Sequence, residues 1–600
     1  MVVLLAPSAD MDMTTEARAC IDEEITKQIL SLCNLRTRRN TLSLISRLPT
    51  ETLATIFIHC AHDYHCEDSS HFTRTVPDWV NVSYVCRHWR NVALNCPTLW
   101  SYIFMKSQRW TEELLARSKQ ASLKLRVRGA LYEKPLRRLH IVEQVINQAE
   151  RIQELCLHLP PTDTHEVLSK LSSRAPRLQT LKILVFGDAC WQSFILFDGD
   201  TPALRTLELS DCSVPLHSLN LSGLTTLSLN RIPGRFQQSM PEFLATLSCM
   251  PGLSHLYLEN DVLASDAGFL SSSAFNTSQK ISLPYLSRLL VGAPISTVIA
   301  LLSCVNIPLK TEVRLLCVSY DPSPDDFAPL SSVLAQRFSI SKGQAPTIRS
   351  LVVDFAAWGV VKLKFSGKER DCDSFGSISC LDWGCNIPLK ITIDSDSDSD
   401  LDPSMMTVDG VHIIRDICCS VPLMNVESIH VTYPPFSPSF WRKMLGHLPH
   451  LRYIKLSYGN MPDLASVLAV TGLTAQESME VQGGHAPSDP DRARISVPML
   501  KELELYRITF SPGSDSDMPD VCITRWCLFD ALSTRNAPGL LTMTRCDDDS
   551  SILSVVVRSW DELVGESDSD SLEGSVSDYD WGERIAAMYS PGMPTLLYMV

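Results

Sequence analysis

The chain has 600 residues, which is too long for one compact core and predicts roughly two to four domains or one elongated repeat array. Apolar residues make up 45% of it and charged residues 20%, as in ordinary folded proteins. The net charge of −15 leaves no basic footprint, so we expect no nucleic-acid partner. No apolar run reaches the roughly 20 residues of a membrane span, so we expect no membrane partner.

The first residues, Met1 to Ala6, are apolar but lack the basic n-region and full h-region of a secretory signal. We therefore expect a cytoplasmic or nuclear location, or both. There the 20 cysteines would be mostly reduced. The Asn-x-Ser/Thr motifs at Asn81 and Asn276 would stay unmodified.

The first predicted element is an amphipathic helix over about residues 20–35, within an N-terminal segment and linker at 1–45. Apolar side chains recur at helical spacing at Ile21, Ile25, Ile29 and Leu32. Acidic residues 22–24 lie in the first turn, where the helix dipole favours negative charge. We expect this helix to pack on its own domain. A coiled-coil arm stays open, although two heptads are short for one.

Two further helices are predicted between residues 48 and 95. Pro49 suits the first position of a helix, where its missing N–H costs nothing. The apolar face of that helix would be formed by Leu53, Ile56, Phe57 and Cys60. Residues 62–77 are polar and predict a loop.

Asp78 can cap the second helix, which ends at the sequence Asn95-Cys96-Pro97. Its apolar stripe would consist of Val82, Val85, Cys86, Trp89 and Ala93. Leu99 and Trp100 follow and give the pair of helices a large apolar anchor.

This ordered set of segments resembles the F-box. The matching strings are Leu48-Pro49-Thr50-Glu51-Thr52-Leu53, Ile56-Phe57, Val85-Cys86-Arg87-His88-Trp89-Arg90 and Pro97-Thr98-Leu99-Trp100. The long loop between the halves is similar to fungal-type F-box proteins. These also tend to carry an Arg-Asn pair before the box, here Arg39-Asn40, and a helix after it, here Glu113 to Ser118.

The resemblance implies that residues 46–104 dock on the Skp adaptor of a cullin-based ubiquitin ligase, whose other subunits supply the chemistry. It also implies which side chains form the apolar faces of the box. These adaptor-binding candidates are Leu48, Pro49, Leu53, Ile56, Val85, Cys86, Trp89, Leu99 and Trp100. Some of them must hold the box itself together, and the sequence does not divide core from contact. Residues 105–150 are expected to form a helical connector.

The remainder carries a recurring L-x-x-L-x-L frame, with Leu, Ile or Val at the marked positions, which is the short strand of a leucine-rich repeat. Its first residues are Ile152, Leu178, Leu204, Leu224, Leu253, Leu286, Val313, Ile348, Val426, Leu451 and Leu500. The frame is permissive, because it also occurs inside the F-box helix at Leu53. Its number of occurrences alone therefore decides nothing.

The context of the frames is more specific. Pro lies two residues before seven of them, although its frequency predicts about one. A Pro at this place suits a turn that cannot join the sheet. From Ile152 to Ile348 the frames recur every 20 to 35 residues, which suits one strand and one return segment per repeat. We therefore predict a degenerate leucine-rich-repeat-like region over 151–510.

Two acidic, Ser-rich stretches interrupt this pattern. One is the loop at 394–402 and the other runs from Glu566 to Asp580, within a C-terminal segment at 511–600. Their self-repelling charge predicts solvated, flexible segments. Ser395 and Ser397 fit an acidophilic kinase pattern, and a regulatory role for them stays open.

We expect no metal, no cofactor and no catalytic site. Residues 59–66 offer His and Cys side chains, but no second cluster would complete a tetrahedral zinc site. Cys418-Cys419 lies in an apolar run and is expected in the core. No nucleophile elbow, metalloprotease helix or phosphate-binding loop occurs.

The predicted fold is an α-helical F-box followed by an irregular α/β leucine-rich-repeat-like solenoid. The predicted function is substrate recognition in a Skp–cullin–F-box ubiquitin ligase that leads to degradation of an unknown target protein. Two alternatives stay open. One is a scaffold with a relic F-box, and the other is an enzyme in the C-terminal part.

Overall fold

A computed structural model describes most of the chain from residue 9 to residue 557. The described residues are 9–66, 78–104, 108–128, 139–185, 193–212, 214–260, 262–264, 280–319, 324–339, 347–356, 360–368, 389–395, 407–432, 438–460, 499–509, 540–544 and 554–557. They belong to two compact units, Met1–Leu423 and Met424–Val600. Among them no helix is long and apolar enough to cross a bilayer.

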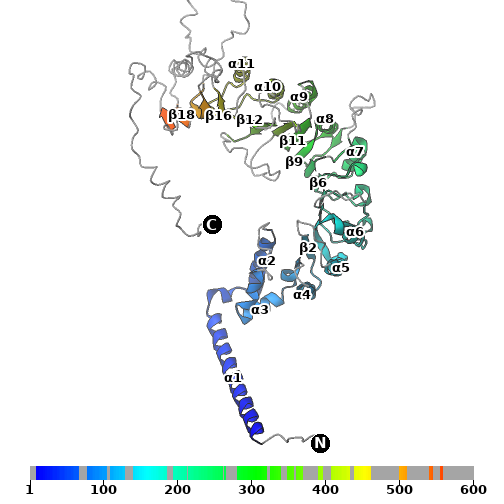
Figure 1. The fold of residues 1–600 in the computed structure, drawn as a ribbon, viewed down its shortest axis with the longest axis vertical. Coiled ribbons are helices and arrows are strands. Elements are labelled where there is room, and N and C mark those ends of the chain that lie inside the picture. Colours follow the sequence, from blue (N-terminus) through cyan, green and yellow to red (C-terminus); the bar gives the residue numbers. More distant parts are fainter. Residues whose placement is uncertain are drawn as a thin grey trace, which may run out of the picture. The chain divides into compact units, whose positions relative to one another are not determined.

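The chain begins with helices (Figure 1). Helix α1 spans Ala9–Thr41, about twice the length expected for it. A 3-10 turn, η1 (Leu44–Arg47), leads to α2 (Thr50–Cys66). Helix α2 starts directly after Pro49, and the N–H of Leu53 donates to the Pro49 carbonyl. It also runs five residues into the segment predicted as a loop, whose remainder, 67–77, lies outside the described residues.

The second predicted helix is broken in two. Residues Asp78–Tyr84 form the 3-10 helix η3, and an α-helix, α3, starts only at Arg87. Cys86 caps the second piece, because its Sγ accepts the backbone N–H of Trp89 at 3.5 Å. Helix α3 ends at Leu94, and η4 (Pro97–Trp100) closes the unit.

Next comes a parallel sheet. Its strands in spatial order are β1 (Tyr102–Phe104), β2 (Leu123–Arg128), β3 (Ile152–Leu159), β4 (Thr180–Val185), β5 (Thr206–Ser210), β6 (Thr226–Asn230), β7 (His255–Glu259), β9 (Arg288–Pro294) and β11 (Glu312–Ser319). Strand β2 lies in the segment predicted as a helical connector, so that prediction was wrong for these residues. The L-x-x-L-x-L frame missed it because Gln120 occupies the first position.

The strands are aligned by a column of buried leucines. Successive pairs place Leu155, Leu181, Leu207, Leu227, Leu256 and Leu289 beside one another, all at most 3% exposed. Before several strands the predicted Pro sits second in a β-turn, where its fixed φ is favourable. In one such turn the N–H of Leu178 donates to the Ala175 carbonyl across Pro176, and Leu204 repeats the bond across Pro202.

The frames predicted the strands well with one exception. At Val313 the frame places Leu316 and Val318 in the core, but the structure buries Leu315 and Cys317 instead. The predicted register is wrong there because one residue fewer separates the turn from the strand than at the other frames. At all other frames the three marked residues are buried.

The sheet of the first unit ends in three strands with antiparallel pairing, of which only β12 (Ser350–Ala356) was predicted by a frame, the one at Ile348. Strand β14 (Leu389–Ser395) pairs parallel with β11. Strand β13 (Val360–Ser366) pairs antiparallel with β14 and with β12. A short pair, β8 (Ile281–Ser282) with β10 (Val305–Asn306), stands apart from this sheet.

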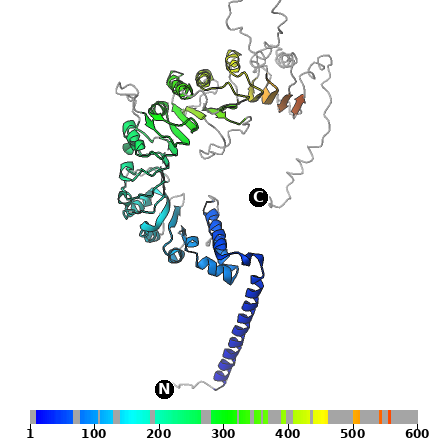
Figure 2. The same cartoon turned by 180° about the vertical axis from the view of Figure 1, so that it is seen from behind.

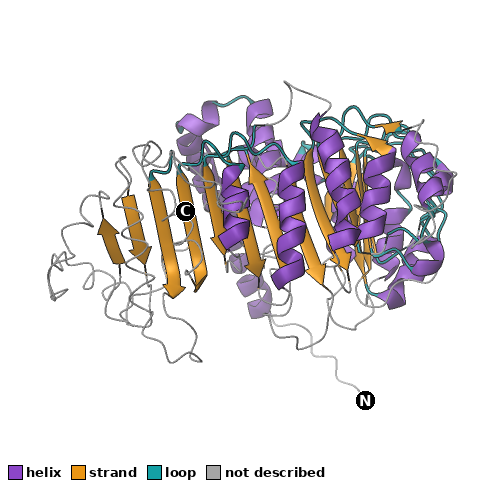
Figure 3. Ribbon diagram, turned by 90° about the horizontal axis from the view of Figure 1, so that it is seen from above, coloured by secondary structure: helices purple, strands orange, loops and turns teal. Residues whose placement is uncertain are grey.

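Helices lie along one face of the sheet in the first unit (Figures 1 and 2), and Figure 3 shows them alongside the strands. They are α4 (Gln108–Ser118), α5 (Leu139–Ile146), α6 (Pro161–Ser169), α7 (Met240–Ser248), α8 (Ile295–Cys304), α9 (Pro324–Ser339) and α10 (Thr407–Ser420). Between α6 and α7 the described parts of the return segments hold only short 3-10 turns, including η7 (Leu216–Ser218) and η8 (Gly234–Phe236). As the 20-residue spacing there suggested, no full helix fits.

In its described residues the second unit is a smaller sheet with one helix, α11 (Pro438–Gly446). Strands β15 (Ser428–Thr432), β16 (Tyr453–Asn460), β17 (Glu502–Thr509) and β18 (Leu540–Thr544) are parallel, and β19 (Ser554–Val557) runs antiparallel to β18. The acidic stretch at 566–580 lies outside the described residues, as does the 394–402 loop beyond Ser395.

Candidate adaptor-binding site

The centre of the helical unit is an apolar core between α2 and α3. Leu53 and Phe57, one turn apart on α2, are at most 1% exposed. The ring of Trp89 packs on Phe57 with centroids 5.1 Å apart. Ala61 continues the same face of α2. The core therefore follows an i, i+4, i+8 stripe, and the predicted stripe through Ile56 and Cys60 was wrong for those two residues.

Trp100 is the anchor that joins this core to its surroundings. It is fully buried, and its indole N–H donates to the Ala93 carbonyl at 2.7 Å. Its ring meets Trp79 edge-on at 5.5 Å, and the Arg117 guanidinium of α4 lies 4.3 Å from its ring centre. Buried aromatic pairs and cation–π contacts of this kind add stability beyond burial alone.

The structure divides the predicted contact residues into three groups. Leu53, Leu99 and Trp100 are fully buried in the unit, so they support it and have no surface to offer an adaptor. Leu48, Cys86 and Trp89 are half-buried, and Pro49, Ile56 and Val85 are exposed. Ile56 is 41% and Val85 58% exposed, which is unusual for aliphatic side chains next to a core.

Three more exposed apolar side chains were missed by the sequence comparison with the F-box. Leu44 and Ile45 lie on η1 just before the matched strings, and Tyr84 ends η3. The helical spacing could have indicated the first of these, because Leu44 precedes Leu48 by four residues. For Tyr84 there was none, since the expected continuous helix would have turned it elsewhere. The exposed apolar residues belong to η1, α2 and η3, and α2 packs against both η3 and α3.

Among the side chains of α2 that the structure describes, no metal centre is evident. His59, Cys60 and His62 are exposed on α2, where the adjacent His59 and Cys60 face different directions. Within the described part of the chain, no group of three or more His, Cys, Asp or Glu side chains is placed to hold a metal ion.

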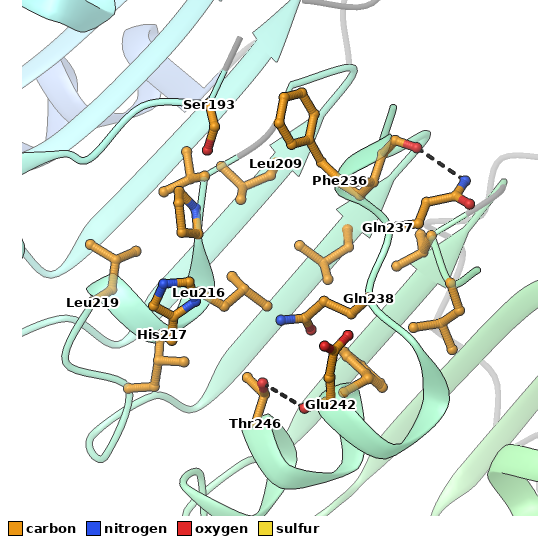
Figure 4. Close-up of a pocket in the computed structure, with 18 of the residues that line it drawn as sticks. Ser193, Leu209, Leu216, His217, Leu219, Phe236, Gln237, Gln238, Glu242 and Thr246 are labelled. Atoms are coloured by element: carbon orange, nitrogen blue, oxygen red, sulfur yellow. Dashed lines mark hydrogen bonds between the residues drawn. The ribbon is translucent and has the colours of Figure 1, made fainter. Parts of the chain in front are cut away.

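A cavity of about 700 Å³ opens where the helix layer is interrupted between α6 and α7 (Figure 4). Its floor includes Leu209 and Leu229 from β5 and β6, and its sides include Leu216 and Phe236 from η7 and η8. Polar groups at its wall include His217, Gln238 and Glu242. Its size is within the roughly 300–1,000 Å³ of typical ligand sites, and its lining is mostly apolar.

The sheet face away from the helices carries polar side chains in rows. Lys124 pairs with Glu154 at 2.5 Å across β2 and β3, and Lys182 pairs with Glu208 at 2.6 Å across β4 and β5. Burial alone would lower the pKa of Lys124, but its hydrogen bond and charge contact with Glu154 raise it above the usual value. This polar face contrasts with the leucine-lined face under the helices, as expected for a sheet with one solvated side.

The family comparison agrees with this geometry. The F-box-like family model matches residues 45–106, which covers η1 to β1. No curated protein matches the chain. The match includes the whole of the helical core described above. This chain is therefore an F-box domain-containing protein.

Proposed function

We propose that this protein is the substrate-recognition subunit of a Skp–cullin–F-box ubiquitin ligase. F-box domains generally bind Skp-type adaptors, and F-box proteins are typically adaptor subunits rather than enzymes. In this proposal the F-box docks on the adaptor and the sheet region holds a target protein for ubiquitination and degradation.

The observation that carries the proposal is the apolar surface of the F-box. Ile56 and Val85 stay exposed although Leu53, Leu99 and Trp100 already fill the core. Fully burying one aliphatic side chain is worth roughly 1.5–3 kcal/mol. An apolar surface around a small helical unit is the usual mark of a protein interface.

We further propose that residues 151–510 form an irregular leucine-rich-repeat-like array. The support is the column of buried leucines through β3 to β9 and the Pro turn before several of these strands. The antiparallel strand β13 would be an insertion in this array. In repeat arrays each unit contacts only its neighbours, so such an insertion can be tolerated.

For the target, we propose the cavity beside α7 as a site for an apolar side chain. Ala245 is an exposed residue of α7 at its wall, and Ser248 is an exposed residue of the same helix outside it. Ala245→Trp should fill the cavity, whereas Ser248→Trp adds the same bulk elsewhere. Proximity labelling in cells should lose its specific target with Ala245→Trp alone. Equal labelling by both variants and the wild type would place the target site elsewhere.

In the scaffold alternative the F-box no longer binds the adaptor. A double substitution at the start of α2 distinguishes this alternative from the main proposal. Leu48→Ala with Pro49→Ala removes one half-buried contact and the fixed φ of the residue just before α2. Adaptor recovered with the protein from cells should fall at least tenfold, or about 1.4 kcal/mol. The target should stay bound and accumulate.

Two results would contradict the main proposal. If the wild-type protein recovers no adaptor, the scaffold takes its place. Reproducible nucleotide or metal in the purified protein, lost on changes in the C-terminal part, would instead favour the enzyme alternative.

A further inference from the structure

Helix α1 carries an apolar stripe that nothing in the described part of the chain covers. Ile21, Ile25, Leu32 and Leu35 are between 49% and 59% exposed. The expectation that this helix packs on its own domain is therefore wrong for these residues. We propose that α1 pairs in antiparallel orientation with α1 of a second copy of this chain.

The spacing of the stripe is that of a helix–helix seam. Ile21, Ile25, Gln28, Leu32 and Leu35 follow one another at intervals of four, three, four and three residues. This is the alternation of a and d positions in a heptad pattern, which keeps one stripe facing a partner helix. Gln28 is the one polar residue in it. A single polar residue in such a seam fixes the register at some cost in stability.

The charges beside the stripe select the partner and its orientation. Asp22 and Glu24 flank the N-terminal part of the stripe, and Arg36 and Arg38 flank the C-terminal part. All four are exposed. By heptad position Asp22 and Arg36 lie on one flank, and Glu24 and Arg38 on the other. Each flank of one helix is therefore acidic at one end and basic at the other.

An antiparallel pair brings these opposite charges together. When Ile25 lies opposite Leu35 of the second copy, Asp22 comes opposite its Arg36. In the same register Glu24 comes opposite its Arg38, because flanks of the same kind meet in antiparallel coiled coils. A parallel pair would set acidic ends against each other and basic ends against each other. Charge complementarity therefore favours the antiparallel arrangement.

Contacts within α1 leave this arrangement possible. Glu23 pairs with Lys27 at 3.0 Å, and these two residues lie away from the stripe. Glu24 accepts a hydrogen bond from the neutral Gln28 side chain at 3.0 Å, which leaves its charge in place. The pair would be short, so we expect it to form at micromolar concentrations rather than to be permanent.

Pairing would give one assembly two F-boxes and two target-binding regions. A target with two copies of its recognition element could then be held at both, with higher avidity than one contact provides. The pairing itself depends on α1 alone and not on the proposed adaptor binding.

The test uses the mass of the full-length protein, measured by sedimentation velocity over a range of concentrations. The wild type should convert from monomer to dimer as its concentration rises. Asp22→Arg with Glu24→Arg should weaken the dimer roughly tenfold or more, because it sets Arg against Arg. Arg36→Glu with Arg38→Glu should weaken the dimer to the same extent, because it sets acidic side chains against each other. Circular dichroism should show that both variants keep their helices.

The decisive sample is an equal mixture of these two variants. In the antiparallel pair every flanking contact between them joins opposite charges, so the mixture should form a heterodimer that neither variant forms alone. Glu23→Lys with Lys27→Glu reverses two charges away from the stripe and should leave the wild-type dimer unchanged. A wild type that stays monomeric, or a mixture that does not pair, would overturn the proposal.

Discussion

At the scale of single residues, position on the helix decides between core and surface. Leu53 is fully buried on α2, and Ile56, almost one turn later, is 41% exposed. Leu53→Asp should unfold the F-box, since it buries a charge without a partner. Ile56→Asp should leave its folding intact. Thermal unfolding followed by tryptophan fluorescence measures both, and a stable Leu53→Asp variant would contradict the core described for this domain.

The neighbouring thiols Cys418 and Cys419 make a matched pair for a reactivity test. Burial raises the pKa of the Cys418 thiol to about 12, while Cys419 is exposed on the same helix. Because the thiolate is the reactive form, iodoacetamide at neutral pH should label Cys419 and spare Cys418. Peptide mass spectrometry of the native protein reads this directly. Equal labelling would show that the Cys418 side chain is not buried beneath α10 but accessible to the reagent. The prediction that both lie in the core was wrong for Cys419.

His430 on β15 should make the second unit sensitive to acid. Burial, with the nearby Lys455 charge, lowers its pKa to about 4, and its Nε2 contacts the Ser457 hydroxyl at 3.0 Å. In the unfolded chain the pKa returns to roughly 6.5. The unfolded state therefore binds the proton more tightly. The contribution of the neutral His430 side chain to the free energy of unfolding is fully present above pH 6.5. It is lost as the pH drops toward 4, by roughly 3 kcal/mol in all.

Chemical unfolding at several pH values isolates this contribution when the wild type is compared with His430→Gln. The variant can keep a hydrogen bond to Ser457 but has no group that titrates in this range. The difference between the two proteins should therefore change between pH 6.5 and 4 and stay constant above it. A difference that does not change with pH would show that His430 is accessible to water.

At the scale of elements, the strand and its preceding turn are the repeating unit of the sheet. Leu207 at the centre of β5 is fully buried between Leu181 and Leu227 of the neighbouring strands, and Thr206 beside it faces the polar side. Leu207→Asp should unfold the sheet region. Thr206→Asp should change stability by less than about 1 kcal/mol. Circular dichroism and protease resistance should separate the two, and a folded Leu207→Asp variant would contradict this packing.

The parallel strands could be predicted because two local signals coincide. Alternating apolar residues mark a half-buried strand, and a Pro in the turn marks where it starts. Strand β13 escaped prediction, because the frame that would start at Val360 has Phe365 at its last marked position, where it requires Leu, Ile or Val. Its antiparallel partners are β12, which directly precedes it in the chain, and β14, which follows only after residues 367–388.

The F-box shows a different limit of sequence reasoning. Its motif identified the domain, but residue type did not reveal that Leu99 is core and Val85 surface. That division depends on how α2, η3 and α3 pack, and on the break at Cys86, which a helical spacing rule cannot foresee. The exposure of the apolar face of α1 could not be predicted either, because it depends on which other elements pack against the helix.

At the scale of the first unit, the F-box and the sheet are continuous. Strand β1, at the end of the F-box-like match, pairs with β2, and Arg117 of α4 stacks over Trp100. A fragment that ends near residue 105 would lose both contacts. Binding to the adaptor is therefore best measured on the full chain.

The central claim is that the exposed apolar side chains of the F-box bind a Skp-type adaptor. Val85→Asp tests it most directly, because Val85 is 58% exposed and its loss should not disturb the core. Ile195→Asp places the same charge at an exposed aliphatic residue outside the F-box and serves as control. Calorimetric titration of the full-length protein with purified adaptor should show binding by the wild type and Ile195→Asp. Val85→Asp should bind at least tenfold more weakly, a loss of about 1.4 kcal/mol or more. No binding by the wild type, or equal binding by Val85→Asp, would contradict the claim.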